Sequence, residues 1–171
     1  MPFSPDNLLQ QLQRHDPVPA YWVAFSGGLD SSVLLYALHA CRSRLQVEIG
    51  AVHVNHGLQA HAAEWETHCR RICAALGVRY ASLPVDATAA PGESPEAAAR
   101  AARYAALARW LPAGHCLLTA QHRDDQAETL LLQLLRGSGV HGLAAMPELN
   151  TFGNGLHLRP LLDYPRSELQ A

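Results

Sequence analysis

The stretch from residue 21 to residue 32 constrains the fold most, because it joins a short apolar run to a glycine pair and then to a helical pattern. Residues 21–25 (YWVAF) have the length and composition of a buried strand. The Ser-Gly-Gly at 26–28 breaks this run, and apolar residues dominate positions 33–38, as expected in a helix. The sequence therefore predicts a strand, a tight turn and a helix in succession.

The turn has the composition of a phosphate-binding loop. Gly27 and Gly28 allow the backbone to come close to a ligand. The start of the following helix presents free N–H groups and a partial positive charge, both of which favour phosphate. Ser26, Ser31 and Ser32 add hydroxyl groups. We therefore expect this loop, Leu29 included, to bind a nucleotide.

Asp30 lies in the same loop and does not favour a bare phosphate. We interpret it as a ligand for Mg²⁺, which prefers carboxylate and phosphate oxygens. The alternative is a structural turn in which Asp30 or Ser31 caps the helix. A Walker A loop is excluded, because that motif needs a Gly-Lys pair and all 13 basic residues of this chain are arginine.

The string at 26–32 (SGGLDSS) resembles the pyrophosphate-binding loop, or PP-loop, of the N-type ATP pyrophosphatases. The resemblance implies an adenine nucleotide alpha hydrolase-like fold. It also implies cleavage of ATP between the α and β phosphates and adenylation of a carbonyl-type oxygen. Asparagine, GMP and argininosuccinate synthetases and several tRNA-modifying enzymes share the loop, so it predicts the chemistry but not the substrate.

Strands and helices alternate along the rest of the chain. We predict further strands at 45–55, 79–85, 115–121 and 155–162, and helices at 4–15, 61–76, 94–110, from 122 onward and from 165 onward. This alternation predicts an α/β fold, a three-layer Rossmann-like domain with a mainly parallel sheet, over residues 1–171. The leucines at positions 130, 131, 132, 134 and 135 predict that the helix after residue 122 is well buried.

Polar residues follow the second predicted strand. Ligands of an open parallel sheet lie at the carboxyl ends of its strands, and His53, Asn55 and His56 fall at such an end, one crossover after the loop. We expect them beside the nucleotide. The alternative is a polar turn that ends the strand.

Arg100 and Arg103 are three residues apart and share a helix face. Spacing alone favours two solvated arginines, with Arg100 paired to Glu96. The functional interpretation is a guanidinium that faces a phosphate.

A second polar face begins directly after the fourth predicted strand, where His122, Asp125, Glu128 and Thr129 share roughly one side of a helix. Two carboxylates there could hold Mg²⁺ or an amine. The alternative is helix capping, because acidic residues in a first turn stabilise a helix by ~0.3–1 kcal/mol. A zinc site with His122 and Asp125 lacks a second histidine at the required spacing.

The composition excludes several classes of protein. The net charge of −2 argues against a stand-alone nucleic-acid-binding module. No apolar run reaches the ~18 residues of a membrane span, and the N-terminus lacks the features of a signal peptide, so we expect a cytoplasmic protein without a membrane partner. The four cysteines form no Cys-x-x-Cys pair and are expected to be apolar fillers.

Six motifs in this order narrow the family: SGGLDSS at 26–32, HVNHGL at 53–58, EAAARAARY at 96–104, HRDDQAET at 122–129, RGSG at 136–139 and RPLL at 159–162. Together they resemble the N-terminal domain of the bacterial tRNA(Ile)-lysidine synthetases, over about residues 20–168. The first motif is widespread, whereas HVNHGL and HRDDQAET are more specific to this family.

The resemblance implies a ligase that forms a carbon–nitrogen bond. ATP adenylates the wobble cytidine of the CAU anticodon of tRNA(Ile), L-lysine displaces AMP to give lysidine, and Mg²⁺ assists the release of pyrophosphate. It implies nucleotide binding by the 26–32 loop and the 53–56 strand end, and Mg²⁺ binding by Asp30. It also implies that Arg100 contacts phosphate or the adenylated intermediate, and that Asp125 and Glu128 hold the lysine cation.

Members of this family are longer than 171 residues, so we expect this chain to be a PP-loop domain truncated at its C-terminal end, without the tRNA-recognition domains. It could then bind ATP without turnover. Another PP-loop adenylating enzyme is the main rival, although a glutaminase-type catalytic cysteine at the start and the cysteine pairs of a tRNA thiolase are both absent from the sequence. Homodimer formation is left open.

Overall fold

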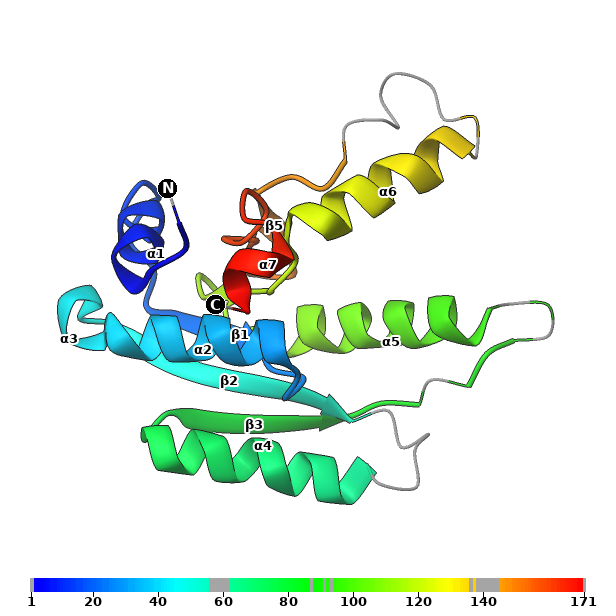
Figure 1. Ribbon diagram of the computed structural model, residues 1–171. Helices are drawn as coiled ribbons and strands as arrows, with labels where there is room; N and C mark the ends of the chain where they lie inside the picture. The colour runs from blue at the N-terminus through cyan, green and yellow to red at the C-terminus, as the bar shows by residue number, and fades with distance from the viewer. Residues whose placement is uncertain are drawn as a thin grey trace.

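The computed structural model describes residues 2–55, 62–86, 88–90, 92, 94–135, 137 and 145–170. Its centre is a six-stranded sheet with the order β3-β2-β1-β4-β6-β5 (Figure 1). The strands are β1 (Ala20–Ala24), β2 (Glu48–Asn55), β3 (Arg79–Pro84), β4 (Cys116–Leu118), β5 (Leu149–Phe152) and β6 (Gly155–Leu158). All neighbouring pairs are parallel except β5 and β6. The predicted mainly parallel α/β architecture is confirmed.

The described part of the chain contains seven helices, of which the first precedes β1 and the last follows β6. They are α1 (Pro5–Leu12), α2 (Leu29–Ala40), α3 (Arg42–Leu45), α4 (Ala62–Leu76), α5 (Pro95–Trp110), α6 (Arg123–Leu135) and α7 (Arg166–Leu169). The sequence predicted each of them except the single-turn helix α3, and it did not predict strand β5.

The strand β1 shows why the sheet has helices on both faces. Its side chains alternate, as in any strand. Tyr21 and Val23 pack in a core cluster with side chains of α1, α2 and α4, whereas Ala20 and Trp22 pack in a second cluster with Leu107 of α5. A strand that is buried on both faces reads as a continuous apolar run, and this accounts for the YWVAF pattern and for the three layers.

Helix α6 departs from the prediction. It extends away from the sheet (Figure 1), and none of its described residues is buried. Leu131, Leu134 and Leu135 are 60%, 51% and 84% exposed. The expectation of a well-buried helix is therefore wrong. A cluster of leucines reports the apolar character of a segment, but it does not report whether a neighbouring element covers that segment.

Candidate nucleotide-binding site

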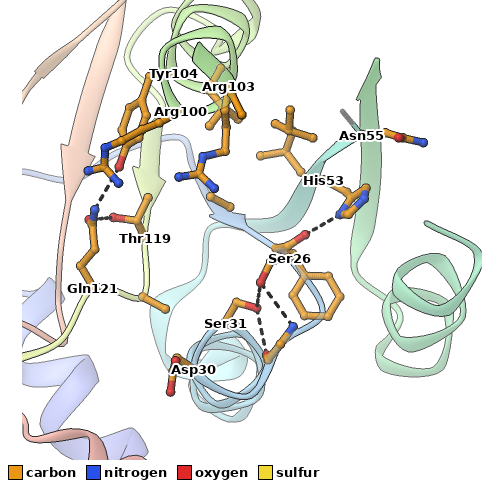
Figure 2. A pocket seen from close by; sticks show the side chains of 18 of the residues that line it. Ser26, Asp30, Ser31, His53, Asn55, Arg100, Arg103, Tyr104, Thr119 and Gln121 are labelled. Atoms are coloured by element: carbon orange, nitrogen blue, oxygen red, sulfur yellow. Dashed lines mark hydrogen bonds between the residues drawn. The ribbon is translucent and has the colours of Figure 1, made fainter. Parts of the chain in front are cut away.

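A pocket of about 570 Å³ opens at the carboxyl ends of β1, β2 and β4, between the start of α2 and the side of α5. This volume falls within the usual range of small-molecule sites. Figure 2 shows its polar side chains, which are Ser26, Asp30, Ser31, His53, Asn55, Arg100, Arg103, Tyr104, Thr119 and Gln121. Gly28 and the indole of Trp65 also line it.

The loop after β1 forms one side of this pocket. Gly27 has a φ of +81°, a left-handed conformation that suits glycine. A Cβ atom at this position would lie 2.8 Å from the Cys69 Sγ atom. Gly28 is the N-cap of α2, so the free N–H groups of that helix begin at the loop. This geometry is suited to an anion.

The loop hydroxyl groups also hold the loop itself. Ser31 and Ser32 both donate to the Gly28 carbonyl oxygen, at 3.1 and 2.9 Å, and the Ser26 and Ser31 hydroxyl oxygens are 3.1 Å apart. Ser26 and Ser31 line the pocket, whereas Gly27, Leu29 and Ser32 are not among the residues that line it.

Asp30 lies on the first turn of α2 and faces two cationic or potentially cationic groups. Its Oδ2 atom is 3.8 Å from His122 Nε2, and its Oδ1 atom is 3.5 Å from Arg166 Nε. The Oδ1 atom is buried and accepts no hydrogen bond. Among the described residues no group of three or more His, Cys, Asp or Glu side chains could hold a metal ion. Apart from the Arg166 guanidinium, the Asp30 Oδ1 atom therefore has no polar partner among the described residues.

The end of β2 contributes His53 and Asn55. His53 is buried, and its Nδ1 atom is 2.9 Å from the Phe25 carbonyl oxygen. Because a carbonyl only accepts, Nδ1 carries the hydrogen, and in this tautomer Nε2 is an acceptor. Asn55 donates to the Glu66 carboxylate at 2.9 Å, and this bond lowers the pKa of Glu66. The expectation for His56 lies outside the described residues.

Helix α5 supplies the cationic wall. Arg100 and Arg103 both line the pocket, with their Cζ atoms 5.0 and 5.6 Å from the centre of the Tyr104 ring. Burial lowers the pKa of the Arg103 guanidinium. Both members of the alternative ion pair between Arg100 and Glu96 belong to the described part of the chain, and the structure shows no such pair.

Asp125 and Glu128 lie apart from this pocket and do not line it. The Asp125 Oδ2 atom accepts the His122 backbone N–H at 2.8 Å, and the Asp125 N–H donates to His122 Nδ1 at 3.4 Å. This reciprocal pair has the form of a capping box at the start of α6. Glu128 is exposed. His122, between Asp30 and Asp125, connects the two carboxylates at 3.8 and 3.3 Å.

Trp65, Tyr104, Thr119 and Gln121 line the pocket but are not among the predicted site residues. Thr119 and Gln121 follow β4 directly, so the rule that ligands gather at carboxyl strand ends could have found them. Tyr104 is the last residue of the EAAARAARY motif at 96–104, which could have indicated it, whereas Trp65 lies on helix α4 and carries no such signal. The described part of the chain contains no helix long and apolar enough to span a membrane.

Comparison with known proteins gives consistent results. The sequence model of a family described as PP-loop domain matches residues 5–171. A tRNA(Ile)-lysidine synthase of Alkalilimnicola ehrlichii is 52% identical over 98% of this chain. The synthases of Pseudomonas syringae and Methylococcus capsulatus are 52% and 51% identical over 98% and 91% of it. The chain spans only 38%, 37% and 35% of the length of these three relatives.

A solved structure shares the fold. The U34-tRNA thiolase NcsA from Methanococcus maripaludis, determined with its [4Fe-4S] cluster, superposes with a TM-score of 0.77 over 97% of this chain and 59% of its own. Its sequence identity is 18%, so the likeness concerns the fold alone. The loop geometry, the strand order and the match over residues 5–171 agree with the resemblance noted in the sequence, and the chain belongs to the PP-loop domain family.

Proposed function

We propose that residues 1–171 form the PP-loop domain of an enzyme that ligates lysine to the wobble cytidine of the CAU anticodon of tRNA(Ile), with release of AMP and pyrophosphate. The observation that supports this most is the identity of about half of all residues with tRNA(Ile)-lysidine synthases across nearly the whole chain. Because these relatives are much longer, the activity is proposed for a protein that contains this chain. Because its proposed substrates are tRNA and free lysine, we propose a cytoplasmic location for this activity.

ATP is proposed to bind in the pocket at the carboxyl edge of the sheet. The pyrophosphate portion would meet the loop after β1 and the N-terminus of α2, where the Gly28 N-cap leaves N–H groups free. The adenosine would lie beside the end of β2, where His53 Nε2 is an acceptor. The proposed nucleotide-binding residues are Ser26, Gly27, Gly28, Leu29, Asp30, Ser31, Ser32, His53, Asn55 and His56.

Asp30 is the proposed contact for Mg²⁺. Its buried Oδ1 atom lacks a hydrogen bond, and one carboxylate plus substrate phosphates is a common way for proteins to bind this ion. When bound, Mg²⁺ would neutralise charge on the departing pyrophosphate. The Arg166 Nε atom is 3.5 Å from the same Oδ1 atom and would help to hold the carboxylate in place.

The remaining proposed catalytic groups act on the reacting base and on lysine. Arg100 lines the pocket and would stabilise negative charge on the adenylated intermediate. Asp125 and Glu128 would attract the lysine ammonium group and accept a proton during attack. Asp125 already caps α6 through its Oδ2 atom, so it would meet lysine through the opposite oxygen, while Glu128 is exposed at the surface.

The test uses a protein of the relatives' full length that carries this chain, with Mg-ATP and labelled lysine. Label transfer is compared between a tRNA(Ile) with a wobble cytidine and the same tRNA with a wobble uridine. We expect transfer to the first alone, its loss in Asp30→Ala, and its retention in Asp16→Ala, which changes an exposed aspartate outside the pocket.

Two outcomes would overturn the proposal. ATP cleavage without transfer to either tRNA would indicate another PP-loop adenylating enzyme. ATP binding without any cleavage would indicate a nucleotide-binding protein.

A further inference from the structure

The pocket has a second polar end, opposite the phosphate loop, that is built around the Gln121 side chain (Figure 2). The Gln121 Oε1 atom accepts from the Thr119 hydroxyl at 2.6 Å and from Arg159 Nε at 2.9 Å. The Gln121 Nε2 atom donates to the Tyr104 hydroxyl at 3.0 Å. Thus both ends of the amide group have partners that determine which way it points.

Arg159 determines the direction of this network, because a guanidinium can only donate. It is 8% exposed and also donates to the Pro147 carbonyl and to the Asn150 side chain, at 2.7 and 3.0 Å. The amide atom that faces its Nε–H must therefore be the oxygen. A flipped amide would place two N–H donors against the guanidinium and against the Thr119 hydroxyl.

His157 supports the same direction from the other side. It is 1% exposed, and its Nε2 atom is 2.8 Å from the Thr119 hydroxyl oxygen. Burial, together with the nearby charges of Arg159 and Arg100, lowers the pKa of His157 to about 3, so the ring is neutral. Since the Thr119 hydrogen goes to Gln121, His157 Nε2 carries a hydrogen and donates to Thr119.

This end of the pocket therefore offers hydrogen-bond donors to a ligand. The Gln121 amide nitrogen has a second N–H beyond the one given to Tyr104, and the Tyr104 oxygen already accepts, which leaves its own hydrogen to donate. Arg100 and Arg103 add two cationic groups. Among the described lining residues, the only carboxylate is Asp30 at the start of α2, where it faces His122 and Arg166.

We propose that Gln121 is a ligand-binding residue that donates its amide N–H to an anionic oxygen of a reactant, and that Arg159 is a positioning residue that fixes the amide. The fitting ligand group has acceptors only, which is true of a phosphoryl oxygen on the nucleotide and of the carboxylate of an amino acid. The inference deepens the proposed function and rests on it for the choice of these two reactants.

Gln121→Glu is the decisive variant. It keeps the oxygen that Thr119 and Arg159 contact, it lets the Tyr104 hydroxyl reverse and donate, and it replaces the pocket-facing N–H by a carboxylate oxygen. A hydrogen bond to a charged group contributes roughly a tenfold to hundredfold effect on binding. We therefore expect Gln121→Glu to bind the ligand that carries the anion at least about tenfold more weakly. Gln121→Met, which lacks both the donor and the charge, is expected to weaken the same ligand by a smaller factor.

The binding of four probes is measured by calorimetry in two matched pairs: AMP with adenosine, and L-lysine with cadaverine, which lacks the carboxylate. If the variant binds AMP more weakly and binds adenosine as before, the subsite is assigned to a phosphoryl group. If the variant binds lysine more weakly and binds cadaverine as before, the subsite is assigned to a carboxylate. No change for any probe, or equal change within both pairs, overturns the proposal.

Three controls separate the inference from structure and from the proposed function. Gln10→Glu, an exposed glutamine on α1, should change none of the four affinities. Arg159→Lys, whose side chain still only donates hydrogen bonds, should bind the anionic probe more tightly than Arg159→Met does. If Arg159 had a merely structural role, its substitution would lower the melting temperature without producing a difference between the paired probes. Lysine transfer to tRNA is scored separately, so its failure refutes the proposed activity without altering the result for the probes.

Discussion

The phosphate loop is expected to tolerate no side chain at position 27. Alanine there must adopt the glycine φ of +81°, which costs an L-residue about 1–2 kcal/mol. Its Cβ atom would also lie 2.8 Å from the Cys69 Sγ atom and 3.1 Å from Trp65 Nε1. Cys69 is completely buried, so it has no free space into which to move.

Overpacking of this kind costs roughly 1–3 kcal/mol. With the backbone contribution, we expect Gly27→Ala to lower the free energy of unfolding by about 2–5 kcal/mol. Gly92→Ala is the matched control, because Gly92 has a nearly identical φ of +84° but no atom within 4 Å of the position of a Cβ. It should show the backbone cost alone.

Urea denaturation followed by circular dichroism measures both variants, and the double variant with Cys69→Ala measures the coupling. The loss from Gly27→Ala should shrink when the Cys69 sulfur is absent, because the closest contact is then removed. Equal losses for Gly27→Ala and Gly92→Ala would refute the steric argument. Undiminished loss in the Cys69→Ala background would assign the whole effect to Trp65 or to the backbone.

Three further measurements test other parts of the structure. Leu135→Ala should change the free energy of unfolding by less than about 0.5 kcal/mol, because Leu135 is 84% exposed. In the same urea titration, Leu118→Ala should lower it by about 2–5 kcal/mol, because Leu118 is fully buried. Arg159→Met should lower the free energy of unfolding by about 2–5 kcal/mol, because it removes the hydrogen bonds that Arg159 donates to buried acceptors. A loss no larger than that of Leu135→Ala would contradict the buried network. His157 has a folded pKa of about 3, below its unfolded value, so only the unfolded state gains a proton as the pH falls through about 6.5, and stability is lost. The wild-type protein should therefore lose about 2 kcal/mol from this group between pH 6.5 and pH 5, and urea titrations of His157→Asn should show a smaller pH dependence in that window.

The buried strands were predictable because a strand that is buried on both faces appears in the sequence as a continuous apolar run. The run at 21–25 is apolar throughout, and it becomes the strand β1 at the centre of the sheet. The edge strand β5 is half-exposed and only four residues long, so it leaves little pattern. Its hairpin signal, the Gly153-Asn154 pair between two short strands, was present in the sequence.

The lining of the pocket was predictable where one motif carries several neighbouring residues that line it. The loop at 26–32 and the end of β2 were both predicted in this way, and both contribute residues to the pocket lining, although Gly27, Leu29 and Ser32 do not line it. The strand-end rule could have identified Thr119 and Gln121, but not their hydrogen-bond network, because the partners come from α5, β6 and the residues that follow each strand. No spacing along the chain shows that Arg159 fixes an amide 38 positions away.

The order of strands in the sheet also governs when the pocket can exist during folding. The central strand β1 pairs on one side with β2 and on the other with β4, whose residue Cys116 lies opposite Tyr21. Contacts that join distant parts of a chain form slowly, because the intervening loop must first be closed. On a ribosome, β1 to β3 and their helices would emerge and associate first. The wall formed by Thr119 and Gln121 must await the emergence of β4 and β6, so nucleotide binding would report the last stage of folding of this domain.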